Sequence, residues 1–194
     1  MLKIALTGGI GTGKSYISRL FFSMGIPVYC ADIEAKKLYY QSEVKQKVKD
    51  FFGKEIFTGE DIDLKKMAVE VFTDPDKLQF INRLIHPLIM QDFEHWAANL
   101  DTHTVIMESA IIFENKLEPF FDLIMVVDAD ENIRKERLKK RDRFLTEEMI
   151  LQRIYSQISQ EEKLKRADLI IDNHIEKRRE IVYKLCNYGV LLPS

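Results

Sequence analysis

The stretch Leu2-Lys3-Ile4-Ala5-Leu6-Thr7-Gly8-Gly9-Ile10-Gly11-Thr12-Gly13-Lys14-Ser15 opens with an apolar run that turns at once into glycines. Residues 2–7 are expected to form a buried strand, and the apolar periodicity that continues through Phe22 indicates a helix. Residues 8–15 lie between them and match the pattern G-x-x-x-x-G-K-[ST] in the strand–loop–helix setting that a phosphate-binding loop requires. The sequence therefore predicts a P-loop that binds a nucleoside triphosphate.

The chemistry of this loop follows from its residue types. Glycines let successive backbone N–H groups point inward at the start of a helix, where they form a cradle for anions. Lys14 is expected to reach the β- and γ-phosphates, and the Ser15 hydroxyl is expected to bind Mg²⁺. The residues predicted to bind the nucleotide here are Gly8, Gly9, Ile10, Gly11, Thr12, Gly13, Lys14, Ser15 and Tyr16.

Four further apolar runs have the character of buried strands. They contain Ile, Val and Leu without polar alternation, which is typical of strands covered on both faces in a parallel sheet. Together with the first strand they predict an α/β fold of the P-loop NTPase type, a doubly wound five-stranded parallel sheet with polar residues at its carboxyl edge. The four runs are Pro27–Ala31, Thr104–Glu108, Leu123–Asp128 and Leu169–Asp172.

The chain is expected to be a single domain, residues 1–194, with two helical additions to its core. Residues 33–100 have weak strand signals and helical patterning, and they are too long for a loop, so a helical subdomain is predicted. Residues 131–166 form a second helical region, interrupted near 142–146, and the nucleotide-binding core comprises 1–32, 101–130 and 167–194. Within the first insertion, helices are expected at Lys45–Phe52, Leu64–Phe72 and Lys77–Leu100, with breaks near Gly53 and Asp74-Pro75.

The net charge, the cysteines and the apolar runs indicate which partners and which cellular location to expect. The 194 residues carry a formal charge of −2, which argues against nucleic-acid binding. Cys30 and Cys186 lie far apart and are expected to be buried, reduced thiols. No apolar run reaches the length of a membrane span, and the N-terminus lacks the pattern of a signal peptide. We expect a cytoplasmic protein that is a monomer or small homo-oligomer and acts on small molecules.

GTPases and EF-hand calcium-binding proteins are excluded, because their motifs are incomplete here or stand beside the wrong elements. Asp50–Gly53 imitates a GTPase switch motif but has no strand leading into it, and Asn115–Glu118 imitates the guanine-reading motif but precedes a strand. Asp128-x-Asp130-x-Asn132 imitates the start of an EF-hand loop but lacks the glycine and the closing glutamate of such a loop. A P-loop kinase remains the favoured interpretation.

A kinase also needs a carboxylate near the γ-phosphate and a basic segment that closes over the phosphates. Asp32 is expected to end the second strand beside the P-loop and to act as the base, although a helix N-cap is an alternative or additional role. The segment Arg134–Arg143 holds seven cations and two anions. It is interpreted as a lid, with a solvated helix face as the alternative.

Six blocks in order resemble the dephospho-CoA kinase family over nearly the whole chain. The loop block is more specific than a bare Walker motif, and Ala31–Lys36 is similar to the family's D-A-D-x-x-A-R pattern. The remaining blocks are Leu84–Ile89, Ile111–Glu114, the lid pattern of Arg137, Arg141 and Asp142 with Arg153, Ile154 and Gln157, and Ala167–Asn173.

The resemblance implies ATP-dependent phosphorylation of the ribose 3′-hydroxyl of dephospho-CoA, which yields coenzyme A. It implies that Asp32 accepts the hydroxyl proton, and that Arg141, helped by Arg137, stabilises charge on the transferred group. Lys14 and Mg²⁺ would hold the β- and γ-phosphates. His86 and Lys36 are assigned to the acceptor side, although a lone histidine before a proline is often purely structural.

Several positions depart from the family pattern, and other functions stay open on the residues alone. Lys36 replaces an arginine, which exchanges a bidentate phosphate contact for a point charge. A nucleoside or nucleoside-monophosphate kinase is an alternative, but the insertion is large for so small an acceptor. A regulatory module that binds ATP without phosphotransfer is a second alternative. The other departures are Tyr16, Cys30, Glu108, Ala110 and Arg134, the last standing where glutamine is usual.

Overall fold

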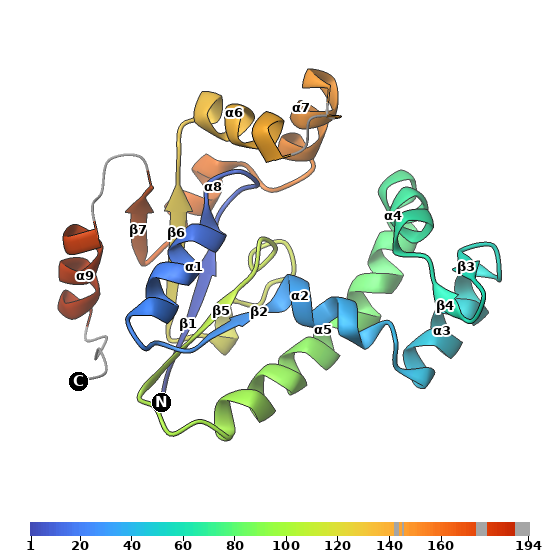
Figure 1. The fold of residues 1–194 in the computed structure, drawn as a ribbon, viewed down its shortest axis with the longest axis horizontal. Helices are drawn as coiled ribbons and strands as arrows, with labels where there is room; N and C mark the ends of the chain where they lie inside the picture. Colours follow the sequence, from blue (N-terminus) through green and yellow to red (C-terminus); the bar gives the residue numbers. More distant parts are fainter. Residues whose placement is uncertain (142–143, 145, 174–177, 189–194) are drawn as a thin grey trace. The chain divides into compact units, whose positions relative to one another are not determined.

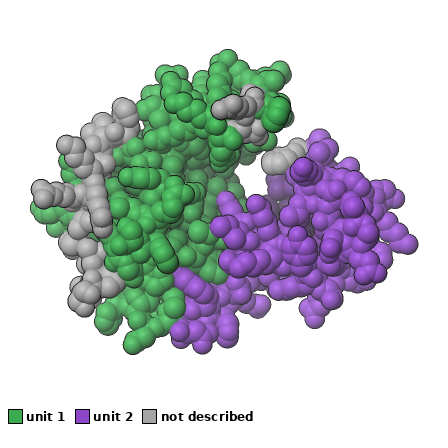
Figure 2. All heavy atoms as spheres, in the orientation of Figure 1, with its two compact units in different colours: residues 1–30, 100–194 green, residues 31–99 purple. Residues whose placement is uncertain are grey.

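The structure is a computed structural model that describes residues 1–141, 144, 146–173 and 178–188. The chain divides into two compact units, which Figure 2 colours separately. Unit 1 comprises residues 1–30 and 100–194, and unit 2 comprises residues 31–99. The boundary after Cys30 assigns Asp32 to unit 2, whereas the sequence analysis grouped it with the core.

Unit 1 is built on a five-stranded parallel sheet in the order β2-β5-β1-β6-β7. This confirms the predicted α/β fold, and four of the five predicted strands have the observed bounds. The fifth, β2, is shorter than the predicted run because its pairing with β5 ends at Cys30. The strands are β1 Leu2–Thr7, β2 Val28–Cys30, β5 Thr104–Glu108, β6 Leu123–Asp128 and β7 Leu169–Asp172.

Both faces of the central strand β1 are buried: Ile4, Ala5 and Leu6 have no exposed surface. This burial explains why the strand sequences do not alternate between apolar and polar residues. On one face, α1 (Lys14–Ser23) contributes Ile17 and Phe21 to the main apolar cluster, and α9 (Arg178–Asn187) contributes Ile181 and Leu185. Figure 1 shows β6 leading directly into α6 (Glu131–Arg141).

In the described part of residues 131–166, unit 1 has three helices. After α6 come α7 (Glu147–Tyr155) and α8 (Gln160–Lys165). Helix α6 ends at Arg141 and α7 begins at Glu147, and most of the expected interruption at 142–146 lies outside the described residues. A further break at 156–159, which was not predicted from the sequence, precedes α8. Leu138 of α6 packs with Ile150 and Ile154 of α7, so α6 and α7 form a small apolar core of their own.

Unit 2 is mainly helical and contains one hairpin that the sequence analysis missed. The hairpin pairs two very short strands, β3 Phe57–Thr58 and β4 Asp61–Ile62, around a turn at Gly59 with φ +66°. Two-residue strands have too few side chains to produce a recognisable alternation. The helices are α2 Ala31–Leu38, α3 Ser42–Phe52, α4 Leu64–Thr73 and α5 Pro75–Ala98.

The expected helix breaks in unit 2 are present and have identifiable local causes. Gly53 ends α3 with φ +81°. The Asp74 side chain accepts hydrogen bonds from the N–H groups of Asp76 and Lys77, and Pro75 is the first residue of α5. The aromatic rings of Phe51 and Phe80 stack with 3.9 Å between centroids, which fastens α3 to α5.

Candidate active site

The P-loop connects β1 to α1, and its glycines occupy positions where a side chain would not fit. Gly8 and Gly13 have φ values of +145° and +96°. A Cβ on Gly8 would lie 2.4 Å from the Val127 carbonyl oxygen, and one on Gly13 would lie 2.1 Å from Asn173 Nδ2. Gly13 is also the N-cap of α1. The backbone therefore curls tightly at the helix N-terminus, where amide N–H groups favour anions.

Lys14 is nearly buried and lies against the loop backbone. Its side-chain ammonium donates hydrogen bonds to the carbonyl oxygens of Gly8 at 2.9 Å and Gly9 at 3.3 Å. The ammonium is thus held at the start of the loop, next to the amides that a phosphate would use. Thr12 stabilises the same turn, because its hydroxyl donates to Gly9 O at 2.9 Å.

Glu108 is the site residue that the list of predicted ligands omitted. It ends β5 and is paired with Leu6 of β1 and Cys30 of β2, so its carboxylate emerges beside the P-loop. The Ser15 hydroxyl donates to Glu108 Oε1 at 3.0 Å, and the Ser18 hydroxyl donates to Oε2 at 2.7 Å. The signal was present in the sequence as a carboxylate at the end of a buried strand.

Cys30 corrects one prediction. Its thiol forms no disulfide and is half-buried rather than buried. It lies at the carboxyl end of β2 and donates to Glu108 Oε2 at 3.6 Å. The side chain of Cys186 lies outside the described part of the structure.

The basic segment on α6 is divided between inward and outward side chains. Arg137 donates through Nη1 to the Thr12 carbonyl oxygen at 2.8 Å and to that of Gly11 at 3.3 Å. Arg141, at the end of the helix, is exposed. Asp142 and Arg143, which belong to the predicted lid pattern, lie outside the described residues.

Asp32 and Lys36 lie in unit 2 on α2, one helical turn apart and both exposed. Because residues four apart share a face, the two side chains extend from the same side of the helix. The expectation that Asp32 ends a strand is wrong: β2 stops at Cys30, and Asp32 is already in the first turn of α2. The alternative N-cap role before Ile33 is also wrong, since the helix begins at Ala31.

His86 is partly buried within α5, directly before Pro87. Burial lowers the pKa of its imidazole from 6.5 to about 4. The ring is therefore neutral at pH 7 and can accept or donate a hydrogen bond without carrying charge.

This shifted pKa predicts a pH-dependent stability. Between pH 6.5 and about 4 the unfolded chain binds a proton that the folded chain resists, so stability falls as the pH drops through this window. One pKa unit corresponds to about 1.4 kcal/mol, so the shift at His86 would lower the free energy of unfolding by at most about 3 kcal/mol across this window. We expect urea unfolding at pH 7.0 and 4.5 to show a smaller difference for His86→Gln than for the wild-type chain. Equal differences would exclude this role.

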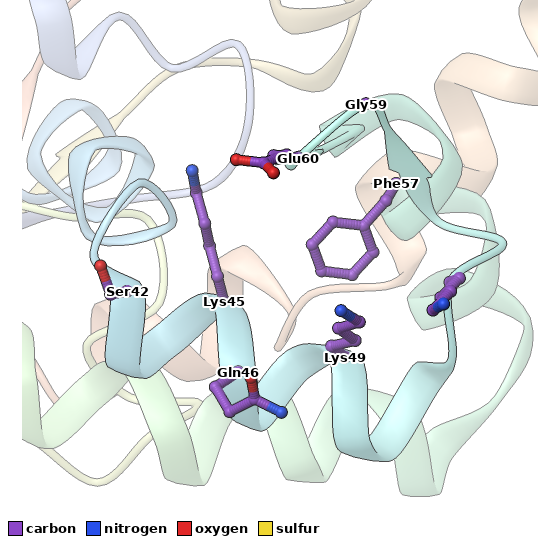
Figure 3. A pocket seen from close by; sticks show the side chains of 8 residues that line it. Ser42, Lys45, Gln46, Lys49, Phe57, Gly59 and Glu60 are labelled. Atoms are coloured by element: carbon purple, nitrogen blue, oxygen red, sulfur yellow. The ribbon is translucent and has the colours of Figure 1, made fainter.

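Unit 2 also contains an open groove of about 480 Å³ between α3 and the β3–β4 hairpin. Figure 3 shows Lys45 and Lys49 extending from α3, with the Phe57 ring above Lys49 in this view and the Glu60 carboxylate near the end of Lys45. Lys45 is paired with Asp61 at 2.5 Å. The groove is net cationic and has one aromatic surface. It is lined by Ser42, Lys45, Gln46, Lys49, Lys54, Phe57, Gly59 and Glu60.

Two other kinds of site were sought within the described residues. No cluster of three or more His, Cys, Asp or Glu side chains there could hold a metal ion by itself. No described helix combines the length and the apolar character needed to span a bilayer.

Comparison with known proteins assigns the chain to a family. The family model for dephospho-CoA kinase matches residues 2–178. A dephospho-CoA kinase of Bacteroides fragilis is 39% identical over 178 residues, covering 91% of this chain and 86% of that protein. The crystal structure of TT1252 from Thermus thermophilus superposes with a TM-score of 0.87 at 27% identity, covering 96% and 97% of the two chains. A dephospho-CoA kinase from Campylobacter jejuni superposes with a TM-score of 0.68 at 26% identity, covering 97% and 98%. The chain belongs to the dephospho-CoA kinase family.

Proposed function

We propose that this protein transfers the γ-phosphoryl group of ATP to the ribose 3′-hydroxyl of dephospho-CoA, giving ADP and coenzyme A. The observation that carries the proposal is the complete P-loop of a chain whose family match extends over residues 2–178. The loop provides the cradle for the phosphates, and family membership supplies the acceptor.

The nucleotide side of the reaction is held by the P-loop. The N–H groups at the start of α1 are suited to the β-phosphate, and the Lys14 ammonium is suited to the β- and γ-phosphate oxygens. Lys14 would exchange its bonds to the Gly8 and Gly9 carbonyl oxygens for phosphate oxygens. Because phosphoryl transfer needs little covalent help from the protein, such positioning and charge neutralisation would provide most of the acceleration.

The residues beside the loop fit Mg²⁺, which prefers oxygen ligands and keeps several of its waters. The Ser15 hydroxyl and the Glu108 carboxylate already lie in contact at 3.0 Å, at the end of the loop where phosphate oxygens would arrive. A bound Mg²⁺ would neutralise negative charge on the β- and γ-phosphates. We assign Ser15 as a direct ligand and Glu108 as the carboxylate that holds it.

On the acceptor side, we assign Asp32 as the group that takes the proton of the 3′-hydroxyl and Lys36 as a phosphate contact. We assign Arg141 the role of stabilising negative charge on the transferred phosphoryl group, and Arg137 would assist Arg141 in this role. His86, neutral at pH 7, is assigned to the acceptor pocket as a hydrogen-bonding group. Unit 2 would carry the acceptor, and residues 131–166 would act as the lid.

The groove on α3 is proposed to bind the diphosphate of the acceptor. Its lysines match negative charge, and the Phe57 ring offers an apolar surface to the rest of the molecule. Reversing two exposed charges, Lys49→Glu with Lys54→Glu, should raise the KM for dephospho-CoA about tenfold and leave the KM for ATP within about twofold. Lys47→Glu, on the same helix but outside the groove lining, is the matched control. An unchanged KM for dephospho-CoA would remove the groove from the acceptor site.

The function as a whole is tested by acceptor-dependent ADP release. Purified protein is given ATP and Mg²⁺ with dephospho-CoA, adenosine, uridine or AMP in turn, and ADP is measured with a coupled assay. Of these four acceptors, we expect only dephospho-CoA to support ADP release. Preference for adenosine, uridine or AMP would assign the protein to nucleoside or nucleoside-monophosphate kinases, and nucleotide binding without ADP release would favour a regulatory module. A cytoplasmic location and a monomeric or small oligomeric state stay predictions.

A further inference from the structure

The carbonyl oxygens of the P-loop are bound from outside the loop. Arg134 of α6 donates through Nε to the Ile10 carbonyl oxygen at 2.9 Å. The Thr12 carbonyl oxygen accepts from Arg137 Nη1 and from Asn173 Nδ2, both at 2.8 Å. Arg137 in turn donates through Nη2 to the carbonyl oxygen of Asn173 at 3.3 Å, so the two donors on Thr12 support each other.

These contacts determine which way the loop amides point. A trans peptide unit is planar, so the carbonyl oxygen of one residue and the N–H of the next point in opposite directions. When Arg134 holds the Ile10 oxygen on its own side, the Gly11 N–H is directed away from Arg134. When Arg137 and Asn173 hold the Thr12 oxygen, the Gly13 N–H is directed away from them. Two amides of the anion cradle are thus oriented by side chains that lie outside it.

Arg134 is in close contact with two of the glycines. A Cβ on Gly9 would lie 2.5 Å from Arg134 Nη2, and one on Gly11 would lie 2.9 Å from the Arg134 carbonyl oxygen. The side chain is 5% exposed. Burial lowers the pKa of the Arg134 guanidinium, whereas the Glu131 and Asp128 carboxylates favour its charged form. The Arg134 charge in turn helps to lower the pKa of Lys163. Among the described residues it has no carboxylate within ion-pair distance, and its Nε–H is bound to the loop backbone.

Two amide N–H groups at the start of the loop are held by glutamine side chains. Gly9 N–H donates to Gln160 Oε1 at 2.9 Å, and Ile10 N–H donates to Gln157 Oε1 at 2.8 Å. Gln160 is itself anchored through Nε2 to the Val127 carbonyl oxygen and the Asp128 carboxylate. Two successive peptide groups are therefore restrained: Gln157 binds the N–H of Ile10, and Arg134 binds its carbonyl oxygen.

We propose that Arg134 is a positioning residue for nucleotide binding, which acts by holding the Ile10 carbonyl oxygen so that the Gly11 N–H faces the phosphates. This inference rests on one part of the proposed function, nucleotide binding by the P-loop, and does not depend on the identity of the acceptor. Arg137 and Asn173 do the same for Gly13. A loop without these restraints would have to order its amides on binding, and the cost would appear as lost affinity.

The test is direct binding of ATP and of ADP by calorimetry, without acceptor. Arg134→Met removes the donor and the charge at similar length, and we expect it to weaken both nucleotides about 10- to 100-fold, the scale of a hydrogen bond from a charged group. Arg134→Lys keeps a cation that can reach one carbonyl oxygen and should recover part of the loss. Lys47→Met, at an exposed position of α3 outside the lid and the groove lining, should bind nucleotide as the wild-type chain does.

Each outcome separates the proposal from its competitors. Equal losses for ATP and ADP with a smaller loss for Arg134→Lys support it, because the amides serve the phosphates common to both nucleotides. A loss for ATP alone would make Arg134 a direct γ-phosphate ligand and overturn it. If Arg134→Met folds with a lower melting temperature but binds ATP and ADP as the wild-type chain does, Arg134 only stabilises the fold, and the proposal is wrong. If Arg134→Met does not fold, Arg134→Gln tests the same contact, since an amide can donate to Ile10 O. Normal nucleotide binding with no turnover on dephospho-CoA would count against the proposed function instead.

Discussion

Replacing Asp32 with asparagine is expected to lower kcat by a factor of about 10²–10⁴, the usual contribution of a general base. Asparagine keeps the size and shape of the side chain but cannot accept the proton of the 3′-hydroxyl. Since Asp32 is not part of the P-loop, the affinity for ATP should stay within about twofold of the wild-type value. Steady-state ADP release at saturating dephospho-CoA, together with calorimetric ATP binding, measures both quantities.

The matched control is Glu34→Gln, which neutralises another carboxylate in the first turn of the same helix. Glu34 is paired with Lys37 at 2.6 Å, so its role is local. We expect this variant to keep most of its turnover. If Asp32→Asn retained more than half of the wild-type kcat, the proton would have to leave by another route, and Asp32 would be a binding residue at most.

Replacing Lys163 with methionine is expected to cost about 3–5 kcal/mol of folding free energy, because it leaves a partner carboxylate without its cation. Lys163 has no exposed surface, and its ammonium donates to Glu114 Oε1 at 2.7 Å and to the Ala110 carbonyl oxygen at 2.9 Å. Burial lowers the pKa of Lys163, while the hydrogen bond that its ammonium donates to Glu114 opposes this shift. The pair joins α8 to the turn that follows β5.

Urea unfolding measures this cost. Lys165→Met, at an exposed position two residues further along α8, should change stability by less than about 0.5 kcal/mol. The double variant Lys163→Met with Glu114→Gln should recover much of the lost stability. It also removes the negative charge of Glu114, which the single variant leaves without its cation. A single variant within about 1 kcal/mol of the wild-type chain would mean that Glu114 finds water or another donor.

Much of the fold was predictable because its signals are local. Buried parallel strands are short, continuous apolar runs. Here β1 ends before Gly8 and β5 ends before Ser109, while Asp128 and Asp172 are the last residues of β6 and β7. The Asp74-Pro75 pair and Gly53 mark helix ends through backbone preferences that act within one turn. The β3–β4 hairpin and the break before α8 were not predicted, since both are too short to produce a periodic pattern.

The positions of the functional side chains were less predictable. The loop ligands could be named because the P-loop is one continuous segment. Asp32 was expected at a strand end and is found inside a helix, since the last pairing of β2 with β5 comes at Cys30. The contact of Glu108 with Ser15 joins residues 93 apart and depends on β5 lying next to β1 in the sheet.

The amino-acid order was sufficient to specify a nucleotide-binding α/β protein with a phosphate loop at residues 8–15, because glycine conformations, apolar runs and helix caps act over a few neighbouring residues. The partners of that loop came from the three-dimensional arrangement: Glu108 beneath Ser15, Arg134 and Arg137 on the loop carbonyls, and Gln157 and Gln160 on its amides. Such contacts depend on the order of the strands and on the direction in which each helix leaves the sheet. The contacts named here join residues 93 to 151 positions apart in the chain, a separation that no local pattern records.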